Sequence, residues 1–170
     1  MLFRSYKARM KDGRWVAVKV QRPNLPLILR RDLAIIRALG VLSAPFLPLN
    51  LGFGLGTIID EFGRSLFDEI DYRKEASNAE YFASLFKDHP EVTIPAVEHS
   101  LSSRRVLTTT WINGVKMADR KEVEAHHMNP AALIRTGVIS GLKQLLEFGY
   151  FHADPHPGNL FALPGDRKST

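Results

Sequence analysis

The feature that most constrains this chain is a short polar loop, FHADPHPGNL, at residues 151–160. It places Asp154 five positions before Asn159. Phosphoryl transfer uses a carboxylate that receives the hydroxyl proton of the acceptor, and an amide oxygen that binds the metal bridging the phosphates. Both side chains must be held on one tight loop. We therefore predict that Asp154 is a catalytic carboxylate and that Asn159 is a metal ligand in a phosphotransferase-like site.

Length and composition limit what can surround this loop. A chain of 170 residues can form one hydrophobic core, whereas a complete two-lobed kinase needs about 250 residues or more. We therefore expect an incomplete domain. The net charge of +5 comes from scattered Lys and Arg, which suits an anionic ligand or membrane surface and argues against nucleic acid as a partner. The lack of cysteine excludes disulfides, thiolate catalysis and thiolate metal sites.

Hydrophobic periodicity predicts an alternation of strands and helices. Alternating residues at 6–10 and 15–20 predict a hairpin around an Asp12-Gly13 turn. Three further features are a turn at Asn113-Gly114, an N-cap at Asn129 and a helix end at Gly149. The other predicted elements are helices at 25–42 (ending near Gly40), 67–86 and from 130 onward, and strands at 95–99 and 106–112.

The segment from Val41 to Ile59 carries no charged residue. It contains two prolines and three glycines, and that density favours a loop between helices over a membrane span. Its glycines, at 52, 54 and 56, resemble a phosphate-binding loop. In a kinase the glycine-rich loop precedes the lysine strand, whereas these glycines follow it, so we interpret the segment as a connector.

Lys19 is a candidate phosphate ligand because it lies on a predicted strand, on the same face as Ala17. An ammonium group facing a cleft can hold ATP phosphates. The strand pattern alone favours a lysine that faces solvent, but the phosphate-binding reading gains support because a catalytic-loop pattern follows downstream in the order that kinases use. A kinase needs a helix glutamate to fix this lysine through an ion pair, and Glu75 is the best candidate.

Asp71 lies one turn before Glu75 on the same face of the predicted helix. Two like charges at this spacing destabilise an isolated helix, which indicates a nearby cation. Arg73 or Lys74 could supply it, and a solvated acidic face is the alternative.

A metal hydrolase is another reading of the polar loop. His152, Asp154 and His156 alternate and could bind zinc through imidazole and carboxylate. No further cluster with ligand spacing supports this reading, since the His126-His127 pair lies far upstream and is typical of a surface beside a helix.

Four motifs taken together resemble the UbiB-like atypical kinases, the aarF domain-containing family. The resemblance covers nearly the whole chain. The motifs are VAVKVQRP at 16–23, EIDYRKEA at 69–76 followed by NAE at 78–80, VLTT at 106–109 and HADPHPGN at 152–159.

The resemblance implies an α+β, protein-kinase-like two-lobed fold that binds ATP with Mg²⁺, associates with membranes and supports quinone or prenyl-lipid metabolism. Residues 1–112 would form the N-lobe, with an inserted helix and the Pro/Gly connector. Residues 113–170 would begin the C-lobe. A prenyl lipid or a membrane surface is the expected partner besides ATP, either on the cytoplasmic side of a bacterial membrane or in a plastid or mitochondrion.

The resemblance also assigns roles by position. Lys19 would contact the phosphates and Glu75 would pair with it. Glu69 and Asp71 match the Glu-x-Asp motif that shapes the family's nucleotide pocket. The remaining two assignments are Asp154 as the catalytic-loop aspartate and Asn159 as the magnesium ligand.

Departures from the family pattern lead us to expect truncation at both ends. The Lys-x-Gly-Gln helix, the alanine-rich nucleotide loop and the Asp-Phe-Gly segment are absent from the sequence, and Asp166 lies in the wrong context to replace the last. Loss of a magnesium ligand removes charge stabilisation from phosphoryl transfer, so we expect the chain as given to be nearly inactive. Two alternatives remain: a noncatalytic pseudokinase that holds a lipid or partner, and an aminoglycoside- or choline-kinase-like enzyme.

Overall fold

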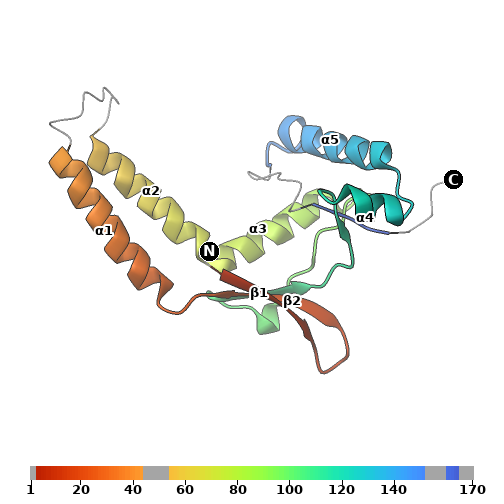
Figure 1. Cartoon of the computed structure of the whole chain (residues 1–170), viewed down its shortest axis with the longest axis horizontal. Helices are drawn as coiled ribbons and strands as arrows, with labels where there is room; N and C mark the ends of the chain where they lie inside the picture. Colours follow the sequence, from red (N-terminus) through yellow and green to blue (C-terminus); the bar gives the residue numbers. More distant parts are fainter. Residues whose placement is uncertain (1–2, 44–53, 152–159, 165–170) are drawn as a thin grey trace. The chain divides into compact units, whose positions relative to one another are not determined.

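The computed structural model describes residues 3–43, 54–151 and 160–164 (Figure 1). The chain forms two compact units, one of residues 1–81 with 96–110 and the other of residues 82–95 with 111–170. The predictions for His152, Asp154, His156 and Asn159, and that for Gly52, lie outside the described residues.

The first unit is built on a three-stranded antiparallel sheet with the order β1-β2-β3. Its strands are β1 (Phe3–Arg9), β2 (Trp15–Gln21) and β3 (Val106–Thr110). The predicted hairpin is confirmed: Met10 N–H donates to the Arg14 carbonyl at 2.8 Å, and Gly13 adopts a φ of +93° that favours glycine. The third strand is two residues shorter than predicted.

The prediction of a strand at residues 95–99 is wrong, because this segment does not form a regular strand. Val97 forms an isolated bridge with Thr109, and the chain then enters the 3-10 helix η2 (His99–Leu101). Two backbone hydrogen bonds join this segment to β3, from Glu98 N–H to the Thr108 carbonyl at 2.8 Å and from Thr110 N–H to the Ala96 carbonyl at 2.9 Å, and side-chain hydrogen bonds add to them. The Thr108 amide donates to Ser102 Oγ at 3.0 Å, and the Thr108 hydroxyl donates to the Leu101 carbonyl at 2.8 Å.

The helix α1 (Leu25–Ser43) continues past Gly40, where we expected it to end, and packs against α2 (Leu55–Glu69) (Figure 1). A methyl group at Gly40 would lie 2.8 Å from Ile59 Cδ1. Gly40 therefore allows α1 and α2 to pack closely and does not end α1. The interpretation of residues 41–59 as a connector is wrong at residues 41–43, which belong to α1, and from Leu55 onward, which belongs to α2. Among the described helices, none has the length and apolar character needed to cross a membrane.

The single helix predicted at residues 67–86 is also wrong. The structure has α2 up to Glu69, a break at Ile70 and Asp71, and then α3 (Tyr72–Leu85). The break has a local cause, because the Asp71 carboxylate accepts the Arg73 N–H at 3.1 Å and so caps the start of α3.

The second unit contains the β4–β5 pair and the helices α4 (Arg120–Ala125) and α5 (Pro130–Leu146). Its strands are β4 (Val115–Lys116) and β5 (Phe161–Ala162). The predicted cap of α5 is confirmed, since the Asn129 side chain accepts the Ala131 and Ala132 N–H groups at 3.0 and 3.2 Å. Phe86 packs edge-on against Phe148, with ring centroids 5.3 Å apart.

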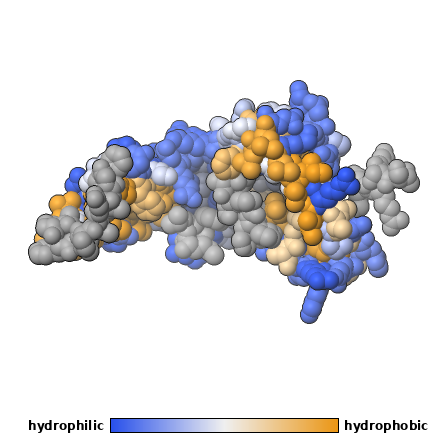
Figure 2. Space-filling view, turned by 90° about the horizontal axis from the view of Figure 1, so that it is seen from above, coloured by the Kyte–Doolittle hydropathy of each residue, from blue (hydrophilic) through white to orange (hydrophobic). Residues whose placement is uncertain are grey.

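The apolar stripe of α5 is exposed within this chain. Figure 2 shows hydrophobic surface in the region of this helix. The residues concerned are Ile134, Val138, Leu142 and Leu145, each at least half exposed.

Gly114 was predicted to turn the chain. In the structure it precedes β4 and, because it lacks a side chain, allows β5 to lie close to the backbone. A Cβ at this position would lie 2.8 Å from Phe161 Cβ and 3.1 Å from the Ala162 carbonyl oxygen.

We expect Gly114→Ala to lower the free energy of unfolding by about 1–3 kcal/mol. The matched control is Gly137→Ala in α5, where an added Cβ meets nothing within 4 Å; it should raise stability by about 0.5–1 kcal/mol. Urea unfolding of both variants checks this, and effects of the same sign would contradict it.

Candidate active site: a strand lysine held by a helix glutamate

The centre of the candidate site is an ion pair between β2 and α3. Lys19 Nζ lies 2.8 Å from both carboxylate oxygens of Glu75. Sheet register places Lys19 opposite Ser5 on β1 and Leu107 on β3, so these residues share one face of the sheet. Glu75 lies in the first turn of α3. The side chains of Lys19 and Glu75 are 25% and 40% exposed, so the pair is partly shielded from solvent.

Tyr72 holds the start of α3 against this face of the sheet. It is buried and forms a cluster with Ala76 and Leu107. Its ring centroid lies 5.0 Å from Lys19 Nζ, which is a cation–π contact. Burial, with a smaller contribution from Glu75, raises the pKa of Tyr72 to about 12. Our sequence reasoning missed this residue; the available signal was an aromatic side chain one turn before Glu75.

Asp71 takes part in a separate charge cluster. Its carboxylate accepts hydrogen bonds from Arg73 Nε at 3.0 Å and from a terminal guanidinium nitrogen of Arg73 at 2.7 Å, and Arg104 Nε lies 3.5 Å away. These contacts hold the pKa of Asp71 at about 2. The two acidic residues therefore have different cations: Lys19 for Glu75, and two arginines for Asp71. Lys74, the other predicted cation, pairs with Asp68 at 2.6 Å.

The Glu-x-Asp motif spans the break between α2 and α3. Glu69 is exposed at the end of α2, and the Ile70 carbonyl between the two acidic residues accepts a hydrogen bond from the buried Gln21 side chain. The Gln21 N–H donates to the Arg105 carbonyl at 3.0 Å. Gln21 thus ties the break to the end of the same strand that carries Lys19. The sequence indicated Gln21 only as one position of the VAVKVQRP motif at 16–23.

Within the described residues, the candidate site offers the Lys19 ammonium group to an anionic ligand. The same residues contain no cluster of side chains that could bind a metal ion. Outside residues 1–2, 44–53, 152–159 and 165–170, no group of three or more His, Asp or Glu side chains could hold a metal ion. The Asp71 carboxylate already forms ion pairs with Arg73 and Arg104. His126 and His127 are exposed at the end of α4. The chemistry of the Lys19–Glu75 pair suits phosphate oxygens, since a lysine ammonium binds phosphate as a point charge.

A strand lysine paired with a helix glutamate, on a small antiparallel sheet, defines a kinase-like fold. The comparisons agree with this class. The model of the ABC1 atypical kinase-like domain matches residues 4–168, so this chain belongs to the ABC1 atypical kinase-like family. The predicted kinase-like fold and the resemblance to aarF domain-containing kinases are confirmed, and the family match decides against an aminoglycoside- or choline-kinase-like enzyme.

Similar proteins come from cyanobacteria, plants and mycobacteria. An uncharacterised protein of Synechocystis sp. is 52% identical over 164 residues, which are 96% of this chain and 29% of that protein. The chloroplastic protein ACTIVITY OF BC1 COMPLEX KINASE 1 of Arabidopsis thaliana is 42% identical, over 95% of this chain and 24% of its own length.

A solved structure is similar as well. The Rv3197–erythromycin complex from Mycobacterium tuberculosis has a TM-score of 0.72 and 34% identity, and the match covers 96% of this chain and 40% of that one. The chain thus spans 24% to 40% of the length of these proteins.

Proposed function

We propose that this chain is the nucleotide-binding part of an ATP-dependent atypical kinase or ATPase, with Lys19 as a ligand of the ATP phosphates. The observation that carries the proposal is the ion pair between Lys19 Nζ and both Glu75 oxygens at 2.8 Å. In protein kinases the corresponding pair positions the lysine on the phosphates.

The surroundings of the pair support a phosphate-binding role. Glu75 sets the direction of the ammonium group, and Tyr72 excludes water from one side of it. A charged group in a partly desolvated, fixed position interacts more strongly with a ligand charge than one on a mobile surface side chain. Glu69 and Asp71 would shape the pocket from the α2–α3 break.

Two further roles rest on the family pattern. Asp154 would receive the proton of the phosphoryl acceptor, and Asn159 would bind Mg²⁺. When bound, Mg²⁺ would neutralise charge on the phosphates. The plant relatives are named as chloroplastic and another relative is cyanobacterial, so we propose a plastid or cyanobacterial setting. From the family resemblance we also propose association with a membrane surface and a role in the metabolism of quinones or other prenyl lipids.

Magnesium-dependent ATP binding by the full-length protein tests this proposal. We expect Lys19→Ala to weaken ATP binding about tenfold to a hundredfold, because it removes a charge-assisted contact with the phosphates. Asp154→Asn should bind ATP normally but lose turnover. The matched control is Lys121→Ala, which removes an exposed lysine of α4 and should leave binding unchanged.

The same titration addresses the noncatalytic alternative. If the full-length protein does not bind ATP with Mg²⁺, the enzyme proposal fails and a pseudokinase that holds a lipid or partner takes its place. Equal ATP affinity in the wild type and Lys19→Ala would remove Lys19 from the site.

A further inference from the structure

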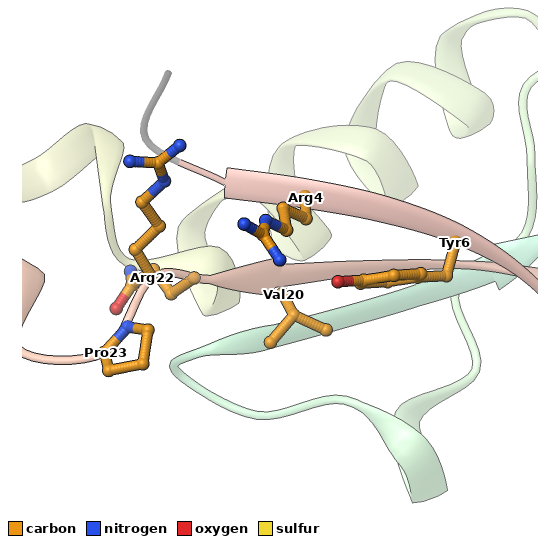
Figure 3. A pocket seen from close by; sticks show the side chains of 6 residues that line it. Arg4, Tyr6, Val20, Arg22 and Pro23 are labelled. Carbon is orange, nitrogen blue, oxygen red and sulfur yellow. The ribbon is translucent and has the colours of Figure 1, made fainter.

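The first unit has a pocket on the sheet face opposite the Lys19–Glu75 pair. Its volume is about 350 Å³ and it is open to solvent. Sheet register pairs Arg4 with Val20 and Tyr6 with Val18 on one face, whereas Lys19 pairs with Ser5 on the other. The pocket is lined by Arg4, Tyr6, Val20, Gln21, Arg22 and Pro23 (Figure 3).

Two arginines and a phenol are candidate ligand-binding groups in this pocket; the side chain of Gln21, which also lines it, donates to the Ile70 carbonyl. Arg4 projects from β1 and Arg22 follows the end of β2, and both are exposed. Neither arginine forms an ion pair with any residue in the described parts of the chain. Most of the other arginines of this unit lie beside a carboxylate, such as Arg14, Arg37 and Arg73. Tyr6 adds a hydroxyl group on the same side, directed toward Arg4 (Figure 3).

The pocket wall also has an apolar part. Val20 and Pro23 lie below the guanidinium groups (Figure 3), and the Tyr6 ring forms the far side. The lining includes no carboxylate. Arg4 and Arg22 line the same pocket, and a bound anion lowers the repulsion between two like charges. Guanidinium groups bind phosphate oxygens in a bidentate manner, which fits an oxyanion better than a chloride-like ion.

We propose that this pocket binds a phosphate ester, with Arg4, Arg22 and the Tyr6 hydroxyl on the phosphate and with Val20 and Pro23 against an apolar substituent. The volume is near the lower end of the range for small-molecule sites, so it suits one phosphate group and a small body. The ligand is either a soluble phosphate ester or the headgroup of an anionic lipid, since both present the same chemistry to the arginines. The site is separate from the proposed nucleotide site because the two lie on opposite faces of the sheet.

The test uses full-length protein carrying Lys19→Ala, so that phosphate binding at Lys19 does not contribute. One arm titrates it with phenyl phosphate and with inorganic phosphate. The other measures co-sedimentation with phosphatidylcholine vesicles that contain phosphatidylglycerol. The pocket variant is Arg4→Gln with Arg22→Gln. The matched control, Arg64→Gln with Arg135→Gln, removes two exposed arginines that do not line the pocket.

We expect the affinity of the pocket variant for phenyl phosphate or for the vesicles to fall at least about tenfold, because hydrogen bonds from charged groups are lost. The affinity of the control variant should change less than about twofold. A loss with phenyl phosphate assigns the site to soluble esters, and a loss confined to vesicles assigns it to lipid headgroups. Phenyl phosphate should bind more tightly than inorganic phosphate because of the apolar wall. Arg22→Gln alone, outside the sheet, repeats the measurement if the double variant unfolds. Equal behaviour of pocket and control variants in both arms would overturn the proposal.

Discussion

Replacing Glu75 with glutamine should lower kcat/KM for ATP turnover by the full-length protein about a hundredfold. The substitution keeps the shape of the side chain but removes the charge that holds Lys19 Nζ at 2.8 Å from both oxygens. A lysine without this partner loses its fixed direction toward the phosphates, and removing one preorganised electrostatic contact costs roughly a hundredfold or more in rate. Steady-state kinetics with ATP as the varied substrate measures the effect.

The stability of the Glu75→Gln variant separates a functional role from a structural one. The Glu75 side chain is 40% exposed, so screening by solvent limits the contribution of the pair to folding to about 1 kcal/mol or less. Glu61→Gln is the matched control, because Glu61 forms an exposed pair with Arg64 at 2.6 Å on α2. We expect Glu61→Gln to retain full activity. Activity of Glu75→Gln within threefold of the wild type would contradict the assigned role.

Replacing Asp71 should affect stability more than any other acidic substitution in the first unit. The carboxylate is 11% exposed, caps α3 through the Arg73 N–H and accepts two hydrogen bonds from the Arg73 guanidinium. We expect Asp71→Ala to lower the free energy of unfolding by about 2–3 kcal/mol at pH 7. The control is Asp68→Asn, whose side chain is 65% exposed, and we expect it to cost less than about 1 kcal/mol.

The contribution of Asp71 should also depend on pH. Its pKa is about 2 in the folded protein, against an ordinary value of 3.8, so the folded state favours the carboxylate. The resulting stabilisation, about 2 kcal/mol, is fully present above pH 4 or so and disappears as the pH falls toward 2. Urea unfolding of the wild type and Asp71→Asn between pH 2 and pH 7 should show two curves that converge at the acidic end. A constant gap across this range would contradict the ion-pair account.

Local patterns predicted those elements whose cause is local. The Asp12-Gly13 hairpin formed as expected because glycine supplies the positive φ of the turn. The helix α5 begins at Pro130 because Asn129 caps it. The break between α2 and α3, which depends on distant contacts, was missed. The α2–α3 break uses Gln21 and Arg104 besides its own cap, and nothing in the spacing of residues 67–86 indicates either partner.

The sequence by itself determined the family and the nature of the candidate residues, because the Lys19 strand and the Glu-x-Asp helix motif are both contiguous stretches of chain. The sequence also favoured Glu75 as the partner of Lys19, but only the tertiary structure shows what separates it from Asp71. Asp71 and Glu75 are equivalent on a continuous helix, but the break at Ile70 and Asp71 turns Asp71 toward Arg73 and Arg104 and leaves Glu75 facing the sheet. The pairing joins residues 56 positions apart. Such a contact forms only when α3 packs on the sheet, and that packing depends on Tyr72 and Ala76 of α3 and on Leu107 of β3 rather than on any local pattern.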